Sequence, residues 1–240
     1  TLTAGTEDAT VNTGYGGGFY GRGFYGQEVQ ATGQYSEATT WSLDNWGQYL
    51  VACNPADGKL WEWQLGTGSD AAVIANAPTD CLGLVVTEDR FIFALGADGD
   101  GRKIAWCDFE DNTLWAAAST NQAGDIDLQT SGQIMAGIRT AGQMLILTDQ
   151  EAHRSTYVGP PFIHQFERVS SACGLIARKA VVDTPAGVFW MSSAGFFTYD
   201  GSSVREIQCD VHDKVFSDLN PAQISKCWAV SNGPNGEVWF

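Results

Sequence analysis

Aspartates that could ligate a cation occur in the turn GADGDG at positions 96–101. Asp98 and Asp100 offer oxygen ligands, with Asp111 as a third, and oxygen is the ligand type that Ca²⁺ prefers. The stretch resembles part of a calcium-binding loop, but the full twelve-residue pattern with its terminal bidentate Glu is absent. We therefore interpret the turn as a solvated hairpin tip, keep Asp98 and Asp100 as the metal-site candidates, and expect no metal and no cofactor.

The sequence contains no recognisable catalytic motif. Glycoside cleavage needs two carboxylates in one pocket, and 28 acidic residues could supply such a pair in any fold, so the requirement discriminates nothing. GxSxG, HExxH and GxxxxGK[ST] patterns are absent, and we expect no enzyme. The six cysteines form no CxxC pair, which predicts buried free thiols at Cys53, Cys81, Cys107, Cys173, Cys209 and Cys227. The three histidines, His153, His164 and His212, do not have the spacing of metal ligands, which argues against a zinc site.

A short apolar phrase headed by Gly or Asp returns five times along the chain. Its copies are GQYLVA at 47–52, EDRFIFAL at 88–95, GQMLIL at 142–147, GVFWM at 187–191 and GEVWF at 236–240. The steps from Gly47 through Asp89, Gly142, Gly187 and Gly236 are 42, 53, 45 and 49 residues. A strand-built period of about 40 to 50 residues predicts an all-β fold, the β-propeller, in which each repeat is one blade of about four strands. The expected blades are 41–78, 79–131, 132–170, 171–211 and, incomplete, 222–240.

Further strand-like runs surround the phrase in each repeat. A run precedes it at 81–86, 134–140, 175–183 and 224–231, and another follows it at 59–64, 103–109, 153–158 and 195–200. The following runs share an aromatic near their ends, namely Trp63, Trp106, Tyr157 and Tyr199. A polar fourth segment, clearest at 162–169 and 204–209, suits the outer rim, where a blade edge meets water. Residues 210–218 are compatible with one or two helical turns.

The chain is strongly acidic, with 28 Asp and Glu against 13 Lys and Arg and a formal net charge of −15. This charge repels nucleic acid and anionic membranes, and excludes a basic DNA-gripping surface. Two interpretations stay open: acidity keeps an aromatic-rich surface soluble, or an acidic wall lines a conduit through which DNA slides without being held. Candidates for that wall, each also a typical solvated turn residue, are Asp98, Asp100, Asp108, Glu110, Asp111, Asp125 and Asp127. No apolar run is long enough to span a bilayer.

The opening segment, residues 1–40, differs from the repeats. Its core GYGGGFYGRGFYG at 14–26 combines seven glycines with five aromatic residues and one Arg. So much Gly favours a flexible linker or an extended arm laid on another subunit, and both interpretations stay open. Stacking on nucleic acid is disfavoured because one Arg supplies little attraction. The candidates for subunit contact are Tyr15, Phe19, Tyr20, Phe24 and Tyr25.

The succession of these phrases resembles one bacteriophage virion family. GYGGGFYGRGFYG is followed by WSLDNWGQYLVACNPADGKLWEW at 41–63, TEDRFIFALG at 87–96, IAWCDFEDNTLWAAASTNQAG at 104–124, CGLIARKAVV at 173–182, FWMSSAGFFTYDG at 189–201 and NGEVWF at 235–240. Individually these phrases are common strand language, but their order is similar to that of the tail nozzle, tail hub or packaged-DNA stabilisation propellers of tailed phages. The resemblance covers most of the chain.

The resemblance implies a non-enzymatic structural subunit of the virion tail, assembled in the host cytoplasm. It further implies a sixfold ring of copies below the portal and adaptor proteins, which continues the DNA channel, retains the genome and passes double-stranded DNA without reading its sequence. Family members are longer, and the chain starts at Thr1 and stops inside the fifth phrase, so we expect a piece of a longer polypeptide. The alternative is a carbohydrate-active or receptor-binding propeller, either a glycosidase or a sugar-binding tail component, which would present a pocket with convergent carboxylates.

Overall fold

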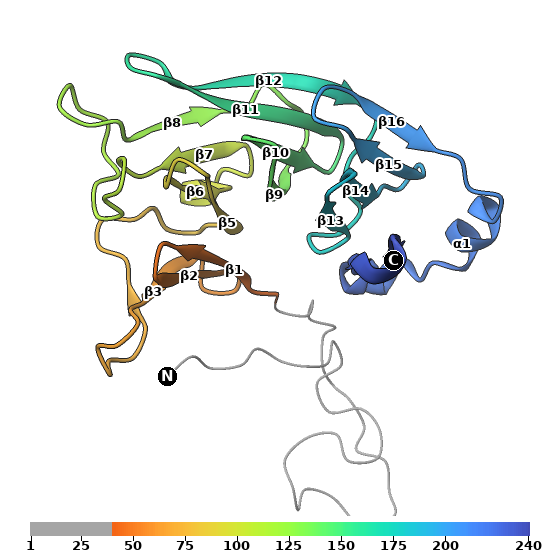
Figure 1. Cartoon of the computed structure of the whole chain (residues 1–240), viewed down its shortest axis with the longest axis horizontal. Helices are drawn as coiled ribbons and strands as arrows, with labels where there is room; N and C mark the ends of the chain where they lie inside the picture. The colour runs from red at the N-terminus through yellow and green to blue at the C-terminus, as the bar shows by residue number, and fades with distance from the viewer. Residues whose placement is uncertain (1–39) are drawn as a thin grey trace, which may run out of the picture. The chain divides into compact units, whose positions relative to one another are not determined.

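The computed structural model describes residues 40–240, so the five aromatic candidates of the arm lie outside the described part. The described chain is built from antiparallel sheets whose strands follow one another in sequence order (Figure 1). Blade 1 contains β1 (Ser42–Trp46), β2 (Tyr49–Asn54), β3 (Lys59–Trp63) and β4 (Ala72–Val73). Blade 2 contains β5 (Gly83–Val86), β6 (Ile92–Leu95), β7 (Lys103–Trp106) and β8 (Gly124–Asp127), with the 3₁₀ turn η1 (Ala97–Gly99) between β6 and β7.

The remaining sheets repeat this plan. Blade 3 contains β9 (Ile134–Thr140), β10 (Gln143–Thr148), β11 (Glu151–Gly159) and β12 (Ile163–Ser171), and blade 4 contains β13 (Val181–Thr184), β14 (Gly187–Met191), β15 (Phe196–Tyr199) and β16 (Val204–Ile207). The helix α1 (His212–Asp218) and the 3₁₀ helix η2 (Pro221–Lys226) connect blade 4 to the two-stranded blade 5, which contains β17 (Val230–Asn232), η3 (Gly233–Asn235) and β18 (Glu237–Trp239).

The repeated apolar phrase forms the second strand of every blade. In blades 1 to 4 this strand has a ladder on each side, and in the internal blades its faces pack against neighbouring elements, so it is apolar at successive positions instead of alternating. In β6 every side chain from Ile92 to Leu95 is buried. A tight turn precedes the strand, and between β9 and β10 both turn residues, Ala141 and Gly142, have positive φ, the pattern of a type I′ hairpin.

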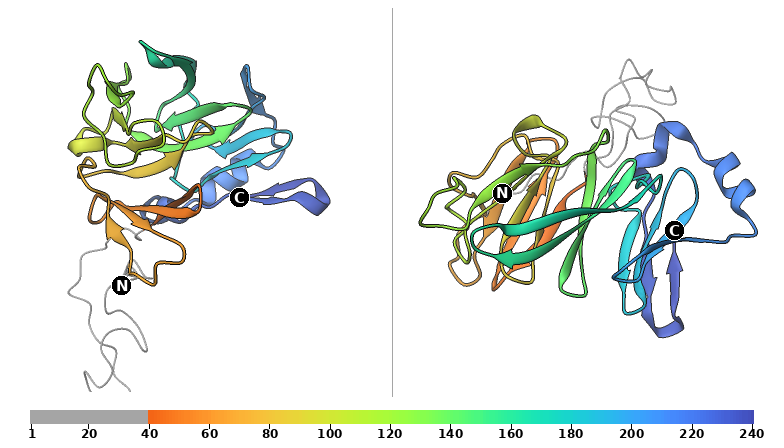
Figure 2. Two further views of the ribbon diagram at one scale, coloured as in Figure 1. Left: turned by 60° about the vertical axis from the view of Figure 1, so that its left-hand side comes forward. Right: turned by 90° about the horizontal axis from the view of Figure 1, so that it is seen from above.

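Apolar clusters lie between successive sheets, not inside a two-layer sandwich. One cluster joins blades 1 and 2 through Trp46, Val51, Leu84 and Ile92, and a second joins blades 2 and 3 through aromatic and aliphatic side chains such as Phe93 and Ile146. A third cluster joins blades 3 and 4 and also includes side chains of α1 and η2. Its members include Leu145, Leu147, Trp190, Tyr199, Phe216 and Ile224. Each internal blade therefore packs between two neighbours. Figure 2 shows the successive sheets side by side when seen from above.

The first strands of the blades lie next to one another along the inner side of the stack. Contacts run from β1 to β5, from β5 to β9, from β9 to β13 and from β13 to β17. The later strands of each sheet lie progressively further out, which puts the polar β12 and β16 at the outer edges of blades 3 and 4. This arrangement confirms the predicted all-β fold class with four-stranded blades.

Two of the predicted inner runs were wrong over part of their length. In the run 175–183 the strand starts only at Val181, because residues 175–180 form the connection in which the Ala180 N–H bonds to the Ala177 carbonyl. In the run 224–231 the first residues belong to η2, and the strand starts at Val230. The apolar side chains of both segments bury against the cluster between blades 3 and 4 instead of entering a ladder. The predicted helical turns at 210–218 are present as α1.

Candidate functional site

A carboxylate ties three inner strands together. Asp44 of β1 accepts hydrogen bonds from the Val86 N–H of β5 at 2.8 Å and from the Arg139 guanidinium of β9 at 2.8 Å. Ser42, Asp44 and Trp46 alternate along β1 and face blade 2, which places this polar group on an otherwise apolar face. Asp44 therefore links blade 1 to both blade 2 and blade 3. No sequence motif predicted this structural role.

A second polar node lies beside the inner strands. Arg178, in the connection before β13, donates to the Leu82 carbonyl at 3.3 Å and to the Met135 carbonyl at 3.1 Å. One side chain from blade 4 thus contacts the backbone of blades 2 and 3. Arg is suited to this because its guanidinium offers several donors in a fixed plane. Both nodes hold blades together, and neither presents a reactive group.

The turn with Asp98 and Asp100 is the tip of the β6–β7 hairpin. Asp98 pairs with the Lys103 ammonium at 2.8 Å, and Asp100 accepts the backbone N–H of Arg102 at 2.9 Å. That backbone hydrogen bond, with the Arg102 side chain, lowers the pKa of the Asp100 carboxyl. Among residues 40–240 no three His, Cys, Asp or Glu side chains come close enough together to hold a metal ion. Both aspartates are engaged in the turn itself.

The other acidic candidates divide between this turn and the opposite end of the sheet. Asp108, Glu110 and Asp111 lie in the β7–β8 connection, at the end of the sheet opposite to the β6–β7 hairpin, because successive antiparallel connections alternate ends. Asp111 accepts from Thr113, which lowers the pKa of the Asp111 carboxyl, and Glu110 pairs with Arg90. Asp125 and Asp127 are on the outer strand β8. Lys103, which pairs with Asp98, is also 3.8 Å from Asp125 and stands opposite Asp127 in the ladder. The seven candidate carboxylates therefore form two groups at opposite ends of blade 2.

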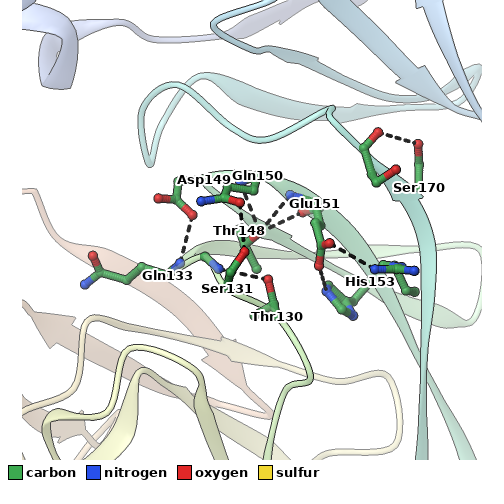
Figure 3. A network of polar contacts seen from close by, with 12 residues as sticks. Thr130, Ser131, Gln133, Thr148, Asp149, Gln150, Glu151, His153 and Ser170 are labelled. Atoms are coloured by element: carbon green, nitrogen blue, oxygen red, sulfur yellow. Dashed lines mark hydrogen bonds and ion pairs between the residues drawn. The ribbon is translucent and has the colours of Figure 1, made fainter.

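A partly buried glutamate and a buried histidine form a pair at the start of β11 (Figure 3). Glu151 Oε2 is 3.2 Å from His153 Nε2, and Arg168 donates to Glu151 Oε1 at 3.1 Å. Burial pushes the pKa of Glu151 up, but hydrogen bonds from Thr130, His153 and Arg168 outweigh it and lower that pKa. Burial also lowers the pKa of His153, which Glu151 offsets only in part. The pair is an ionised carboxylate beside a neutral imidazole at neutral pH.

The surroundings of this pair are structural. Thr148, fully buried before the β10–β11 turn, accepts from the Gln150 and Glu151 N–H groups, and Asp149 accepts from the Gln133 N–H at 2.8 Å (Figure 3). Side chains on both sides of the turn therefore fix the end of blade 3. Within the described residues the His153 ring is hydrogen-bonded to Glu151 and to no hydroxyl or thiol that it could activate. The network joins the β8–β9 connection to the β10–β11 hairpin.

The cysteines and histidines are dispersed across the blades. All six cysteines are free thiols, and four of them are buried: Cys53, Cys81, Cys107 and Cys173. Burial raises the pKa values of Cys53, Cys81 and Cys107 to about 12, which makes them inert. His153 and His164 belong to blade 3, and His212 begins α1, where it contacts Asp213 and the Ala194 carbonyl.

The two end blades each present one apolar face with no sheet against it in the described part of the chain. On blade 1 the face opposite to blade 2 carries Leu43, Trp63 and Val73, with Leu43 57% exposed. On blade 5 the paired residues Val230 and Trp239 point outward, with Trp239 59% exposed. Exposed apolar patches of this kind mark sites of protein contact. They are the surfaces that differ most from the internal blades.

Comparison with known proteins bears on the fold. No family model and no curated protein matches the chain. Among solved structures, streptogramin B lyase matches with a TM-score of 0.51 at 8% identity, covering 83% of this chain and 61% of that one. The dihydro-heme d1 dehydrogenase NirN matches at 0.49 and 14% identity, covering 77% and 39%, and the β-propeller domain of Cps50 (Swd1) from Myceliophteria thermophila at 0.46 and 12%, covering 72% and 56%.

The fold is a β-propeller. At these identities the likeness extends to the fold alone, and the chain spans less than two thirds of the length of each of these three proteins. No helix among the described residues combines the length and the hydropathy needed to cross a bilayer. The propeller therefore supplies a rigid frame, and its activity must be argued from its own surfaces.

Proposed function

We propose that this protein is a structural subunit of a bacteriophage tail, of the nozzle or hub type, that forms part of the path of the packaged DNA. The strongest support is that the phrases resembling this family follow one another in the family's order, and that several of them contain strands of successive stacked blades. A chance collection of strand-like phrases would carry no such order. The role requires a stiff frame and no reaction.

The packing between blades supports a role in which the protein resists mechanical load. Each internal blade buries both faces, and Asp44 and Arg178 connect the inner strands across more than two blades. Closely packed interiors of this kind have low compressibility and transmit strain. A wall that contains pressurised DNA needs this property, whereas a hinged enzyme does not.

The charge supports a wall that does not hold DNA. A net charge of −15 keeps phosphate contacts few, so a passing duplex gains no affinity from counterion release. The carboxylates of blade 2 occur at both ends of the sheet and at its rim, so either end could face the duplex. The partners in this proposal are other copies of the chain and neighbouring portal, adaptor and tail proteins.

The end faces supply the contact surface that assembly needs. Leu43, Trp63 and Val73 on blade 1, with Val230 and Trp239 on blade 5, give two different apolar patches on one chain. Contacts between unlike patches are heterologous, and such contacts close into rings when the rotation between copies allows it. We include self-association through these faces in the proposal.

Sedimentation velocity and negative-stain electron microscopy of the full-length protein test this function. We expect rings at high concentration, dissociation on Trp239→Ser, and no dissociation on the control Trp61→Phe, which keeps an aromatic ring on the blade 1 face. Incubation of the same protein with host surface glycans should release no sugar. A monomer at every concentration that hydrolyses or saturably binds a glycan would replace the proposal with the carbohydrate-active alternative.

A further inference from the structure

Two buried polar atoms between blades 2 and 3 have no partner among the described residues. They are the Ser155 hydroxyl of β11 and Nε2 of His164 on β12, in side chains that are 1% and 8% exposed. Ser155 pairs with Phe166 and His164 with Tyr157 in the ladder, so both side chains lie on the face of blade 3 that packs against blade 2. A buried polar atom left unpaired is costly, so each one calls for an explanation, such as a bound water, ion or ligand group.

Aromatic side chains fix the His164 ring. Its centroid lies 4.8 Å from that of Phe93, 4.9 Å from Phe91 and 5.2 Å from Trp106, each edge-on. Burial among these rings lowers the pKa of His164 to about 4, so the imidazole is neutral at pH 7. With the proton on Nδ1, the orphan Nε2 is a hydrogen-bond acceptor. Phe91, Phe93 and Trp106 therefore hold the His164 ring so that its Nε2 acceptor keeps one direction.

A small cavity opens beside these two atoms. Its floor is formed by Met144, Ser155, Tyr157 and His164, and its mouth by the β5–β6 and β9–β10 turns. The remaining lining residues are Thr87, Glu88, Asp89, Gly142 and Gln143. The space admits about one water-sized group, which excludes a sugar ring or a nucleotide base.

The mouth is negative. Glu88 and Asp89 line it, and no ion pair links either carboxylate to a described Lys or Arg. Arg90, next to them in sequence, pairs with Glu110, and Arg139 pairs with Asp44, so these two guanidinium groups are engaged elsewhere. An anion would meet two like charges here, whereas a cation would meet two opposite ones.

We propose that this cavity binds the ammonium group of a primary aliphatic amine. A –NH₃⁺ group has three donors and the size of one water, and it would donate to His164 Nε2 and Ser155 Oγ while Glu88 and Asp89 balance its charge. The alkyl chain would leave through the mouth past the turns. A metal ion is a poorer match, because the described residues bring no three His, Cys, Asp or Glu together. The proposal is independent of the role in a phage tail.

Isothermal titration of the full chain with n-butylammonium and with n-butyltrimethylammonium tests the site. The two probes have the same charge, but the second has no N–H donor and is too large for the cavity. We expect saturable binding of the first at least tenfold tighter than that of the second, and a loss of about tenfold on Ser155→Ala, a change that removes an unpaired hydroxyl. His164→Phe, which retains the aromatic packing, should abolish binding.

A pair of matched charge variants separates the cavity from general acidity. Glu88→Gln with Asp89→Asn should weaken n-butylammonium at least tenfold, whereas Asp125→Asn with Asp127→Asn, which removes the same charge from β8, should leave the affinity within twofold. Circular dichroism of each variant checks that it is folded. Equal affinity for the two probes, equal effects of the two charge pairs, or a crystal soaked in n-butylammonium that shows a water only would overturn the proposal.

Discussion

Removal of the Asp44 carboxylate should loosen three blades at once. Its side chain is 13% exposed, and the Val86 N–H that it binds belongs to a residue that is 2% exposed. Asp44→Ala leaves this buried N–H without a partner, at a cost of about 1 to 3 kcal/mol. The ion pair with Arg139 adds less, about 0 to 1 kcal/mol, because the Arg139 side chain is 42% exposed and screened by water.

The expected loss in the free energy of unfolding is therefore about 1 to 4 kcal/mol for Asp44→Ala, and about 1 kcal/mol for Asp44→Asn, which keeps an acceptor oxygen. Urea unfolding followed by tryptophan fluorescence measures both. A double-mutant cycle with Arg139→Ala isolates the ion pair, and its coupling energy should stay below about 1 kcal/mol. If Asp44→Ala costs no more than Asp125→Ala on the outer strand, the inner strands are not held as described.

Three other changes have defined outcomes. Burial lowers the pKa of His164 from 6.5 to about 4, so the unfolded chain binds this proton more tightly than the folded chain. The free energy of unfolding should therefore fall by up to about 3 kcal/mol as the pH is lowered from 6.5 to 4. Urea titrations should show a smaller fall for His164→Phe. Trp190 is fully buried, and its Nε1–H donates to the Cys173 carbonyl. Trp190→Ala should lower the free energy of unfolding by about 3 to 5 kcal/mol and Trp190→Phe by less, as measured by thermal unfolding. A thiol reagent under native conditions should modify Cys209 and Cys227 first, with the four buried thiols reacting only after urea is added; prompt reaction of all six would contradict the packing.

The blade plan could be predicted because it is repeated. The apolar second strand lies between two ladders in blades 1 to 4, and the same phrase recurs at each copy with Gly or Asp at the preceding turn. The first strand of blade 1 and the outer strands β4 and β8 were harder to predict. β4 has two residues, Ala72 and Val73, which is too short for an alternating pattern.

The contacts between blades could not be predicted from local pattern. Asp44 sits in SLDNW, and the alternation of Ser42, Asp44 and Trp46 was the available signal for an inward carboxylate, but its partners Val86 and Arg139 come from other repeats. The same holds for the cavity, because Glu88, Ser155 and His164 come together only when blades 2 and 3 stack. The sequence likewise did not show that the acidic turns of blade 2 lie at opposite ends of the sheet.

Electron cryo-microscopy of the intact particle that contains this protein tests the proposed role most directly. We expect a ring of copies along the tail axis, in which the stacked blades surround the DNA path and the exposed faces of blades 1 and 5 are covered by protein. Density for the chain on a host-facing fibre with glycan in a blade-top pocket, or its absence from the particle altogether, would refute the proposed role.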